Sequence, residues 1–179
     1  MQIPEQLWLQ AARQMDEDTL AAIYDTFSPG LFRYACRLLG DSATAEDCVA
    51  ETFSRFLRAL HAGGGPQDHL QAYLYRVAHN WITDQYRRQP PPPLSLDETP
   101  LQSTVSAEHT AERSIRHEQV RTALTRLTAD QRQVMVLKYL EGLQNDEIAR
   151  ALAKPVGAVK ALQHRAEAAL RRLLIRLEE

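Results

Sequence analysis

Apolar side chains recur along this chain at the three- and four-residue spacing of amphipathic α-helices, and no stretch alternates as a β-strand would. In the first half this pattern predicts helices over about residues 18–39, 44–60 and 68–88. Ser28-Pro29-Gly30 is expected to break or kink the first helix, because proline removes a backbone donor. Asp68 is expected to cap the third. The side chains expected to face the core are Leu20, Ile23, Tyr24, Phe27, Leu31, Ala35, Leu38, Leu39, Val49, Phe53, Phe56, Leu57, Leu60, Leu70, Leu74, Val77, Ala78 and Trp81.

The helical pattern resumes in the second half of the chain. The apolar face of its first helix consists of Val120, Leu124 and Leu127. Thr128 and Gln131 then have the spacing of a capping box, which predicts a helix over about residues 129–141. Gly142 is expected to end that helix, because glycine readily adopts the left-handed conformation found after helix C-termini.

The last two helices have the proportions of a helix-turn-helix motif. A short helix is expected over residues 145–152, with Asn145 as its cap. A longer one is expected from Pro155, which suits a first helical position, to about Leu174. The turn between them is Ala153-Lys154-Pro155. The side chains of the longer helix expected to face the core are Val159, Leu162, Ala166 and Leu170.

Four consecutive prolines, at positions 90–93, separate the two groups of helices and cannot continue a helix. Together with the polar stretch that follows, they predict an extended or disordered linker over residues 90–112. The expected fold is therefore all-α. It consists of two small helical domains, over residues 1–89 and 113–179, joined by a Pro-rich linker.

The composition is that of an ordinary globular protein, with 44% apolar and 25% charged residues in a chain of 179. Cys36 and Cys48 lack the spacing of metal ligands or of a disulfide framework. No apolar run reaches the roughly 18 residues needed to span a bilayer, and the N-terminus lacks the pattern of a secretory signal. We therefore expect a cytoplasmic protein.

The net charge of −2 conceals an uneven distribution along the chain. Residues 1–90 carry 8 basic and 11 acidic side chains, whereas residues 115–179 carry 12 basic and 8 acidic ones. The stretch from Arg150 to Arg176 contains seven basic residues and one acidic residue, Glu167. An anionic partner is therefore expected at the C-terminal third of the chain.

A helix-turn-helix motif lays its second helix in the major groove of DNA. Glutamine can pair there with adenine, arginine or lysine with guanine, and alanine can contact the thymine methyl group. The alternative is a solvated basic helix in a bundle, which the asymmetry of charge across this helix disfavours. The candidate contacts with bases or phosphates, in and just after a motif over about residues 144–163, are Lys154, Ala158, Lys160, Ala161, Gln163, His164 and Arg165.

The helix expected over residues 68–88 interleaves aromatic, amide and guanidinium groups. Such a surface can stack unpaired bases and hold their phosphates, at about 1–3 kcal/mol per stacked base. Four of its apolar members are more often core residues than base platforms: Tyr73, Leu74, Val77 and Trp81. Exposure is expected instead for Asn80, Asp84, Arg87 and Arg88.

Catalysis finds no support in the sequence. The six histidines are scattered, and no serine or cysteine has a general base at motif spacing. Three consecutive glycines, at positions 63–65, are not followed by the lysine of a phosphate-binding loop and predict a flexible loop instead. We therefore expect neither an enzyme nor a bound cofactor or metal ion.

Three stretches, in this order, are similar to those of the bacterial extracytoplasmic-function (ECF) sigma factors, compact initiation subunits of RNA polymerase. They cover residues 45–53, 73–88 and 127–160. The first resembles the family's polymerase-binding helix, the second its minus-ten promoter segment and the third its minus-thirty-five domain. The resemblance extends over nearly the whole chain, with the Pro-rich linker in the family's place.

The resemblance implies a role for particular residues. Asp47, Glu51 and Phe53 would contact core RNA polymerase. The loop over residues 61–69 and the helix after it would capture an unpaired base of the minus-ten promoter element, and the helix-turn-helix would hold the minus-thirty-five duplex. The implied minus-ten residues are Asn80, Trp81, Asp84, Arg87 and Arg88. An anti-sigma protein is a further implied partner.

The function expected is that of an alternative-type sigma factor, which binds core polymerase, recognises promoter DNA and promotes transcription initiation. A stand-alone helix-turn-helix regulator would instead bind duplex DNA without polymerase, as a dimer. A helical adaptor that never touches DNA is a third hypothesis. The chain departs from residues common in the family at Gln144, Ala153, Pro155, Ala158, Ala161, Leu162 and Gln163.

Overall fold

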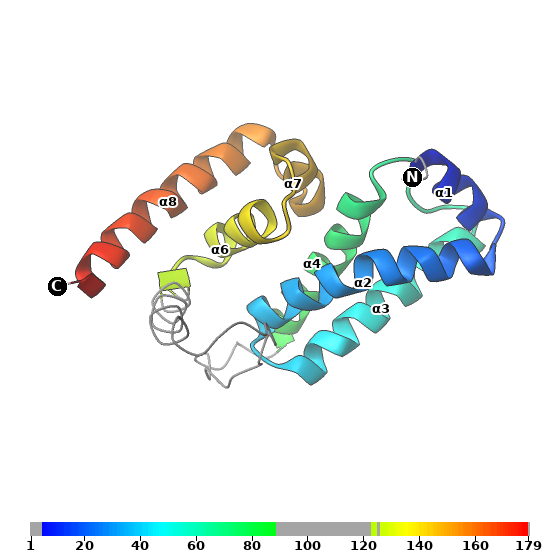
Figure 1. Cartoon of the computed structure of the whole chain (residues 1–179), viewed down its shortest axis with the longest axis horizontal. Helices are drawn as coiled ribbons and strands as arrows, with labels where there is room; N and C mark the ends of the chain where they lie inside the picture. Colours follow the sequence, from blue (N-terminus) through cyan, green and yellow to red (C-terminus); the bar gives the residue numbers. More distant parts are fainter. Residues whose placement is uncertain (1–4, 89–122, 125, 179) are drawn as a thin grey trace, which may run out of the picture.

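The computed structural model of the chain describes residues 5–88, 123, 124 and 126–178. The predicted linker and most of the helix expected before Leu127 lie outside these residues. Within them every regular element is helical, which confirms the predicted all-α fold (Figure 1). The elements are α1 (Glu5–Arg13), α2 (Glu17–Leu39), α3 (Ser42–His61), α4 (Leu70–Arg88), α6 (Ala129–Met135), the π-helix η1 (Val136–Leu140), α7 (Asn145–Leu152) and α8 (Val156–Glu178).

Helix α1 was not predicted from the sequence. Its signal is short: Trp8, Leu9 and Ala12 repeat at helical spacing over only two turns. Leu9 and Ala12 are 1% and 0% exposed and join the core of the N-terminal unit, α1–α4. The edge of the Trp8 ring packs on Phe27 of α2, with the ring centroids 6.1 Å apart.

Of the break or kink expected at Pro29, the break is wrong, because α2 continues through it without interruption. A proline inside a helix costs about 3 kcal/mol, so burial on both sides of Pro29 must outweigh that cost. Ile23 before it, and Leu31 and Tyr34 after it, are at most 1% exposed. The whole of α2 therefore packs as one continuous helix against α3 and α4.

Three helices begin at polar caps close in sequence. The carboxylates of Asp16 and Asp41 accept hydrogen bonds from the amides three residues later, which opens α2 and α3. The capping box predicted at Thr128 and Gln131 is confirmed, with both reciprocal bonds present at 3.1 and 3.3 Å.

The expected Asn145 cap of α7 is wrong. The amide of Gln144 donates instead to the Glu147 carboxylate at 2.6 Å, and Asn145 is the first helical residue. Glutamic acid three residues into a helix can thus satisfy a cap amide without a serine or asparagine at the cap itself.

The helix predicted over residues 129–141 changes type midway. It is α-helical to Met135 and then forms the five-residue π-helix η1 before Gly142, whose φ of 72° ends it as expected. A π-turn is wider than an α-turn and changes the direction of the side chains that follow. Here Tyr139 contacts α8, whereas Glu141 faces the N-terminal unit.

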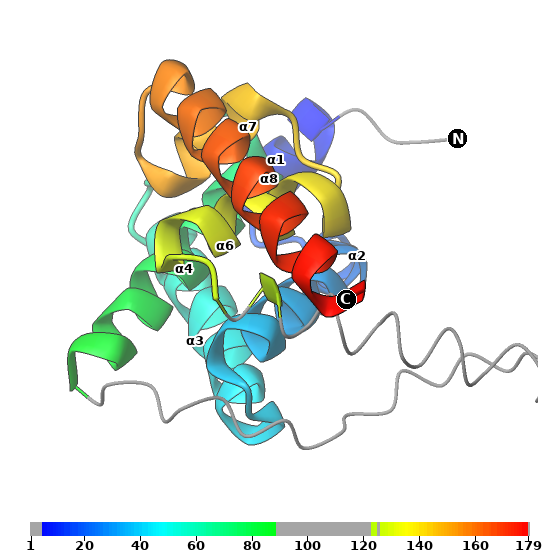
Figure 2. The same ribbon diagram turned by 90° about the vertical axis from the view of Figure 1, so that its left-hand side faces the viewer.

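A single apolar core connects the N-terminal unit with the C-terminal unit, η1 and α6–α8. Figure 1 shows α4 between the α2–α3 pair and α7, and Figure 2 shows α8 crossing the near end of the molecule. Helix α7 packs against α4, and the core of the N-terminal unit is continuous with Leu137, Leu143, Ile148 and Leu152 of the C-terminal unit. The two units are therefore docked on each other.

The core location predicted for two residues is wrong: Tyr24 is 47% exposed and Leu57 is 38% exposed. The remaining predicted core positions of the N-terminal unit are buried or half-buried.

Candidate nucleic-acid interface

The helix-turn-helix predicted from the sequence is present. Helix α7 ends at Ala153, which has left-handed backbone angles of φ 52° and ψ 43°. The Lys154 amide then donates to the Ala149 carbonyl at 2.9 Å, which closes the turn. Val159 and Ala166 of α8 are fully buried, and Leu162 and Leu170 pack at the edge of the core, as predicted.

The exposed face of α8 is basic and close to the turn. Lys160, Ala161, His164 and Arg165 are exposed, and Ala158 is half-buried. The Arg165 Nε donates to the Ala161 carbonyl of its own helix at 3.3 Å. The first three turns of α8 therefore present cationic and small side chains on one surface, which suits entry into a major groove.

Gln163 is engaged inside the protein. Its Nε2 donates to the Tyr139 hydroxyl at 3.1 Å and to the Glu167 carboxylate at 2.9 Å, and the Tyr139 hydroxyl donates to the same carboxylate at 2.6 Å. These bonds lower the pKa of Glu167, the Tyr139 bond most. In this structure Gln163 thus fixes α8 on η1, and its contact with DNA stays a prediction.

Lys154, in the turn, also has a protein partner. Its Nζ lies 3.1 Å from Asp130 at the start of α6. The lysine side chain is 30% exposed, so part of it remains accessible to solvent.

On α4, the predicted exposure of four residues is confirmed. Asn80, Asp84, Arg87 and Arg88 are exposed. Trp81 is half-buried and packs against the core. Arg87 lies 3.6 Å from Asp84 in an exposed pair, which contributes little to stability.

The predicted polymerase contacts on α3 differ in exposure. Asp47 is exposed. Glu51 pairs with Arg55 and Arg58 of its own helix at 2.7 and 3.1 Å, and the Arg55 hydrogen bond is the main cause that lowers its pKa.

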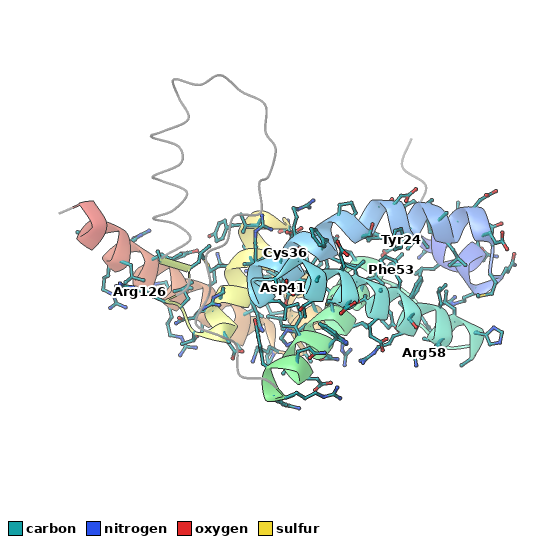
Figure 3. The ribbon with its side chains drawn as sticks, turned by 90° about the horizontal axis from the view of Figure 1, so that it is seen from below. Tyr24, Cys36, Asp41, Phe53, Arg58 and Arg126 are labelled. Carbon is teal, nitrogen blue, oxygen red and sulfur yellow. The ribbon has the colours of Figure 1, made fainter. Side chains whose placement is uncertain are left out.

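Phe53 is 8% exposed, so its ring lies in the core and little of it is accessible at the surface. Tyr24 covers it, with the ring centroids 4.7 Å apart (Figure 3). The accessible apolar groups next to Phe53 are thus Tyr24 and Leu57, and Asp47 is exposed nearer the start of α3.

The loop between α3 and α4 is anchored from α1. The Asp68 cap expected for α4 is wrong, because the Leu70 amide donates to the Glu5 carboxylate while Asp68 approaches its neighbour His69. His69 has a left-handed φ of 50°, which turns the chain into α4. Gln67 and Asp68, at the tip of the loop, are exposed.

Among the ion pairs of the described residues, the most deeply buried acid lies between the two units. The Glu141 side chain is 2% exposed, and its oxygens lie 2.8 Å from Arg37 Nη1 and 3.2 Å from Arg33 Nη2. The Tyr75 hydroxyl donates to the same carboxylate at 3.1 Å. Burial raises the pKa of Tyr75, so this hydroxyl keeps its proton. We call these four residues the Glu141 cluster.

Gly30 lies directly under the Glu141 cluster. A Cβ at this position would lie 2.7 Å from the Tyr75 hydroxyl and 3.2 Å from a Glu141 oxygen. Since glycine weakens a helix interior by about 0.5–1 kcal/mol relative to alanine, its presence in the middle of α2 is explained by this approach.

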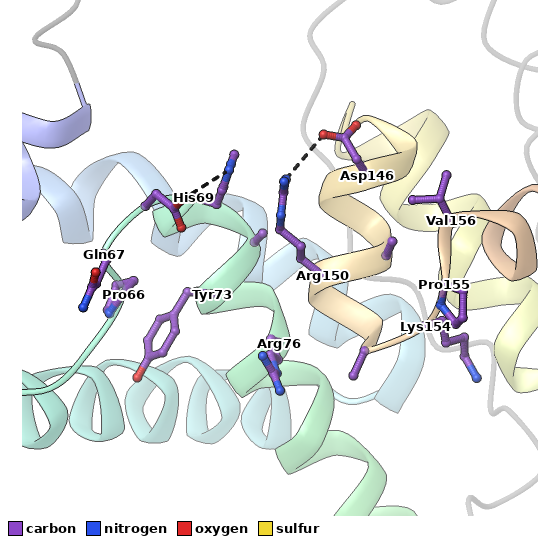
Figure 4. Close-up of a pocket in the computed structure, with 14 residues that line it drawn as sticks. Pro66, Gln67, His69, Tyr73, Arg76, Asp146, Arg150, Lys154, Pro155 and Val156 are labelled. Atoms are coloured by element: carbon purple, nitrogen blue, oxygen red, sulfur yellow. Dashed lines mark hydrogen bonds and ion pairs between the residues drawn. The ribbon is translucent and has the colours of Figure 1, made fainter.

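A cleft of about 720 Å³ opens where the two units meet (Figure 4). One wall consists of the loop before α4 and its first turns, including His69, Tyr73 and Arg76. The other consists of α7 and the turn, including Arg150 and Val156. The predicted single-strand loop and the start of the predicted reading helix therefore line the same cleft.

Comparison with known proteins places both units in one family. The family model "Sigma-70 region 2" matches residues 23–90, and "Sigma-70, region 4" matches residues 117–170. The ECF RNA polymerase sigma factor SigL of Mycobacterium tuberculosis is 35% identical, over 85% of this chain and 86% of its own length. The chain belongs to the ECF sigma factors. BldN of Streptomyces coelicolor, of the same family, is 31% identical over 93% of this chain, which spans 64% of BldN's length.

Solved structures of sigma factors share the fold. CnrH in complex with the cytosolic domain of CnrY superposes with a TM-score of 0.72, at 23% identity and over 96% of this chain and 97% of CnrH. RpoE of Bartonella quintana, in complex with the anti-sigma factor NepR, gives a TM-score of 0.65 at 24% identity, over 86% of this chain and 95% of RpoE.

Membership of the sigma factors confirms the prediction that this chain is not an enzyme, because the family acts by binding. No helix in the described part of the chain combines the length and apolar character needed to cross a bilayer. Helix α1 precedes the residues that match the region 2 family model.

The left-handed Ala153 predicts a stabilising substitution. An L-residue in the left-handed conformation costs about 1–2 kcal/mol, a cost that glycine avoids. Part of this gain is lost because glycine gives up more conformational entropy on folding. Ala153→Gly should therefore raise the free energy of unfolding by about 0.5–1 kcal/mol, measured by urea titration. Gly142→Ala is the matched control: its φ is also positive and its Cβ would meet no atom within 4 Å, so stability should fall there. An Ala153→Gly protein less stable than the wild type would contradict the left-handed conformation of Ala153.

Proposed function

We propose that this sigma factor binds core RNA polymerase in the cytoplasm through α2 and α3, and recognises promoter DNA with two separate surfaces. Asp47 and the apolar patch of Tyr24 and Leu57 form the polymerase surface. The division into residues 1–89, 90–112 and 113–179 assigns one DNA surface to each folded unit. Region 4 reads duplex DNA, and region 2 holds an unpaired base.

The basic face of α8 supports the duplex-reading part of the proposal. Lys160, His164 and Arg165 lie within three turns of the helix start, and α7 lies across it. Major-groove recognition places residues of this kind against base edges and phosphates. Arg165 and Lys160 are proposed to contact guanine or phosphate, and Ala158 and Ala161 to lie against thymine methyl groups.

The exposed side chains of α4 support the single-strand part. Asn80, Asp84, Arg87 and Arg88 line the solvent side of the helix, and Trp81 lies at the edge of the core. Stacking and phosphate contacts of about 1–3 kcal/mol per base offset the few kcal/mol that extruding a base costs. Promoter opening then needs no nucleotide hydrolysis by this chain.

The docked form is proposed to be the state before polymerase binds. The loop before α4 and the start of α8 line one cleft of about 720 Å³. The minus-ten and minus-thirty-five elements are about 25 base pairs apart, or roughly 85 Å at 3.4 Å per base pair. Two units docked on each other cannot reach elements this far apart, so the units must separate first. An anti-sigma protein is proposed to act on this same docked form.

Gel-shift measurements on promoter DNA, with and without core polymerase, test the function. The proposal predicts weak binding by the free chain and a stable complex once core is added, because fixing both units raises the effective concentration of the second contact. Tight binding of the free chain to a two-fold site would instead support a stand-alone regulator. No DNA binding under either condition would support an adaptor.

A further inference from the structure

Helix α1 touches both ends of the loop that precedes α4. Glu5, at its first position, accepts a hydrogen bond from the Leu70 amide. Arg13, at its last position, donates from Nη2 to the Pro66 carbonyl at 2.8 Å. These partners are 65 and 53 residues apart in the sequence. The two contacts bracket the tip of the loop, residues 67–69.

The helix that carries these two contacts is itself firmly seated. Leu9 and Ala12, between Glu5 and Arg13, are buried against α2 and α3. Trp8 adds an edge-to-face contact with Phe27. The two anchors are therefore held at a fixed separation of about 12 Å along one helix, at 1.5 Å per residue.

The loop needs external support because of its own composition. Gly63 and Gly65 have φ of 75° and 91°, which other residues rarely adopt. Glycine gives the unanchored chain many alternative conformations. The Glu5 carboxylate also satisfies a free amide at the N-terminus of α4, where a negative charge is favoured by the helix dipole.

We propose that α1 is a positioning element for promoter opening: through Glu5 and Arg13 it fixes the loop so that Gln67 and Asp68 face the unpaired base. Neither Glu5 nor Arg13 is proposed to touch DNA. The inference rests on the proposed function, in which the loop and α4 capture a minus-ten base. It assigns a role to a helix outside the region 2 match.

The test uses the full chain, core polymerase and a promoter duplex that carries 2-aminopurine at the minus-ten position to be extruded. The double variant Glu5→Ala, Arg13→Ala should slow the fluorescence rise about tenfold, the effect of a single charged hydrogen bond. Affinity for core and for the isolated minus-thirty-five duplex should be unchanged. Glu5→Gln with Arg13→Lys keeps an acceptor and a donor, and should recover most of the rate. Gln10→Ala, on the exposed side of the same helix, is the matched control and should have no effect.

Hydrogen exchange in the free chain provides a readout that does not depend on transcription. Amides of residues 67–70 should exchange faster in the double variant than in the wild type, and those of α3 should not. The inference would be overturned if the double variant kept the wild-type exchange rate in this loop or the wild-type rate of promoter opening. Parallel losses of core binding and opening, which indicate a general structural role, would also overturn it. A wild-type holoenzyme without any fluorescence change would instead refute the proposed base capture itself.

Discussion

Glu141→Ala should release region 4 from region 2. The substitution leaves the Tyr75 hydroxyl without its acceptor and removes the acid that Arg33 and Arg37 share. Removing one partner of a fully buried pair costs 3–5 kcal/mol; because both arginines partly reach solvent, we expect about 2 kcal/mol. That corresponds to a shift of about 30-fold in the docking equilibrium. Small-angle X-ray scattering should show a larger radius of gyration, and α7 amides should exchange faster.

Gly30→Ala should have the same effect without removing a charge. Its new methyl group would enter the space of the Tyr75 hydroxyl and of Glu141. Elsewhere in a helix this change stabilises by about 0.5–1 kcal/mol, so a loosened interface would identify the close approach as the cause. Glu46→Ala removes an exposed carboxylate from α3 and serves as the charge-matched control. Scattering profiles identical to the wild type in both Glu141→Ala and Gly30→Ala would show that the Glu141 cluster does not hold the units together.

Lys160→Ala and Arg165→Ala should weaken binding of the holoenzyme to its minus-thirty-five element. A bidentate contact with a base contributes about 1–3 kcal/mol, which corresponds to roughly 5- to 150-fold in affinity for each site. If the contact is with guanine, the loss should depend on the base at one position of the element. Binding to a panel of single-base variants of that element measures this.

Arg172→Ala is the control for the reading face. It removes the same charge from an exposed position of the same helix, more than one turn beyond the proposed contacts. Its effect should be a small change in salt dependence that is uniform across sequences. Equal losses for Arg172→Ala and Arg165→Ala would reduce the role of α8 to general electrostatic attraction.

Local sequence signals predicted most of the helices. Thr128 and Gln131 formed the expected capping box, and Gly142 ended the following element because its left-handed backbone favours glycine. Val159 and Ala166 of α8 are buried at the spacing that the pattern predicted. These features depend on residues within a turn or two of each other, so a linear reading can find them.

The features that the sequence did not predict depend on distant partners. Glu141 meets Arg33 across 108 residues, and Glu5 meets Leu70 across 65. The break expected at Pro29 followed from local propensity alone, and tertiary packing overrode it. Gln163 has the side chain of a base-reading residue, and its bond to Tyr139 of the π-helix could not be predicted from the sequence. A side chain's chemistry indicates what it can bind, whereas the fold decides which partner it meets.

The most direct test of the central claim is transcription by the reconstituted holoenzyme. Purified chain and bacterial core polymerase should be mixed with genomic DNA fragments, and the 5′ ends of the transcripts mapped. If the chain is a sigma factor that recognises promoters, the transcripts should begin at discrete sites that core alone does not use. These sites should share two sequence elements at a constant spacing. Start sites indistinguishable from those of core alone would contradict the account.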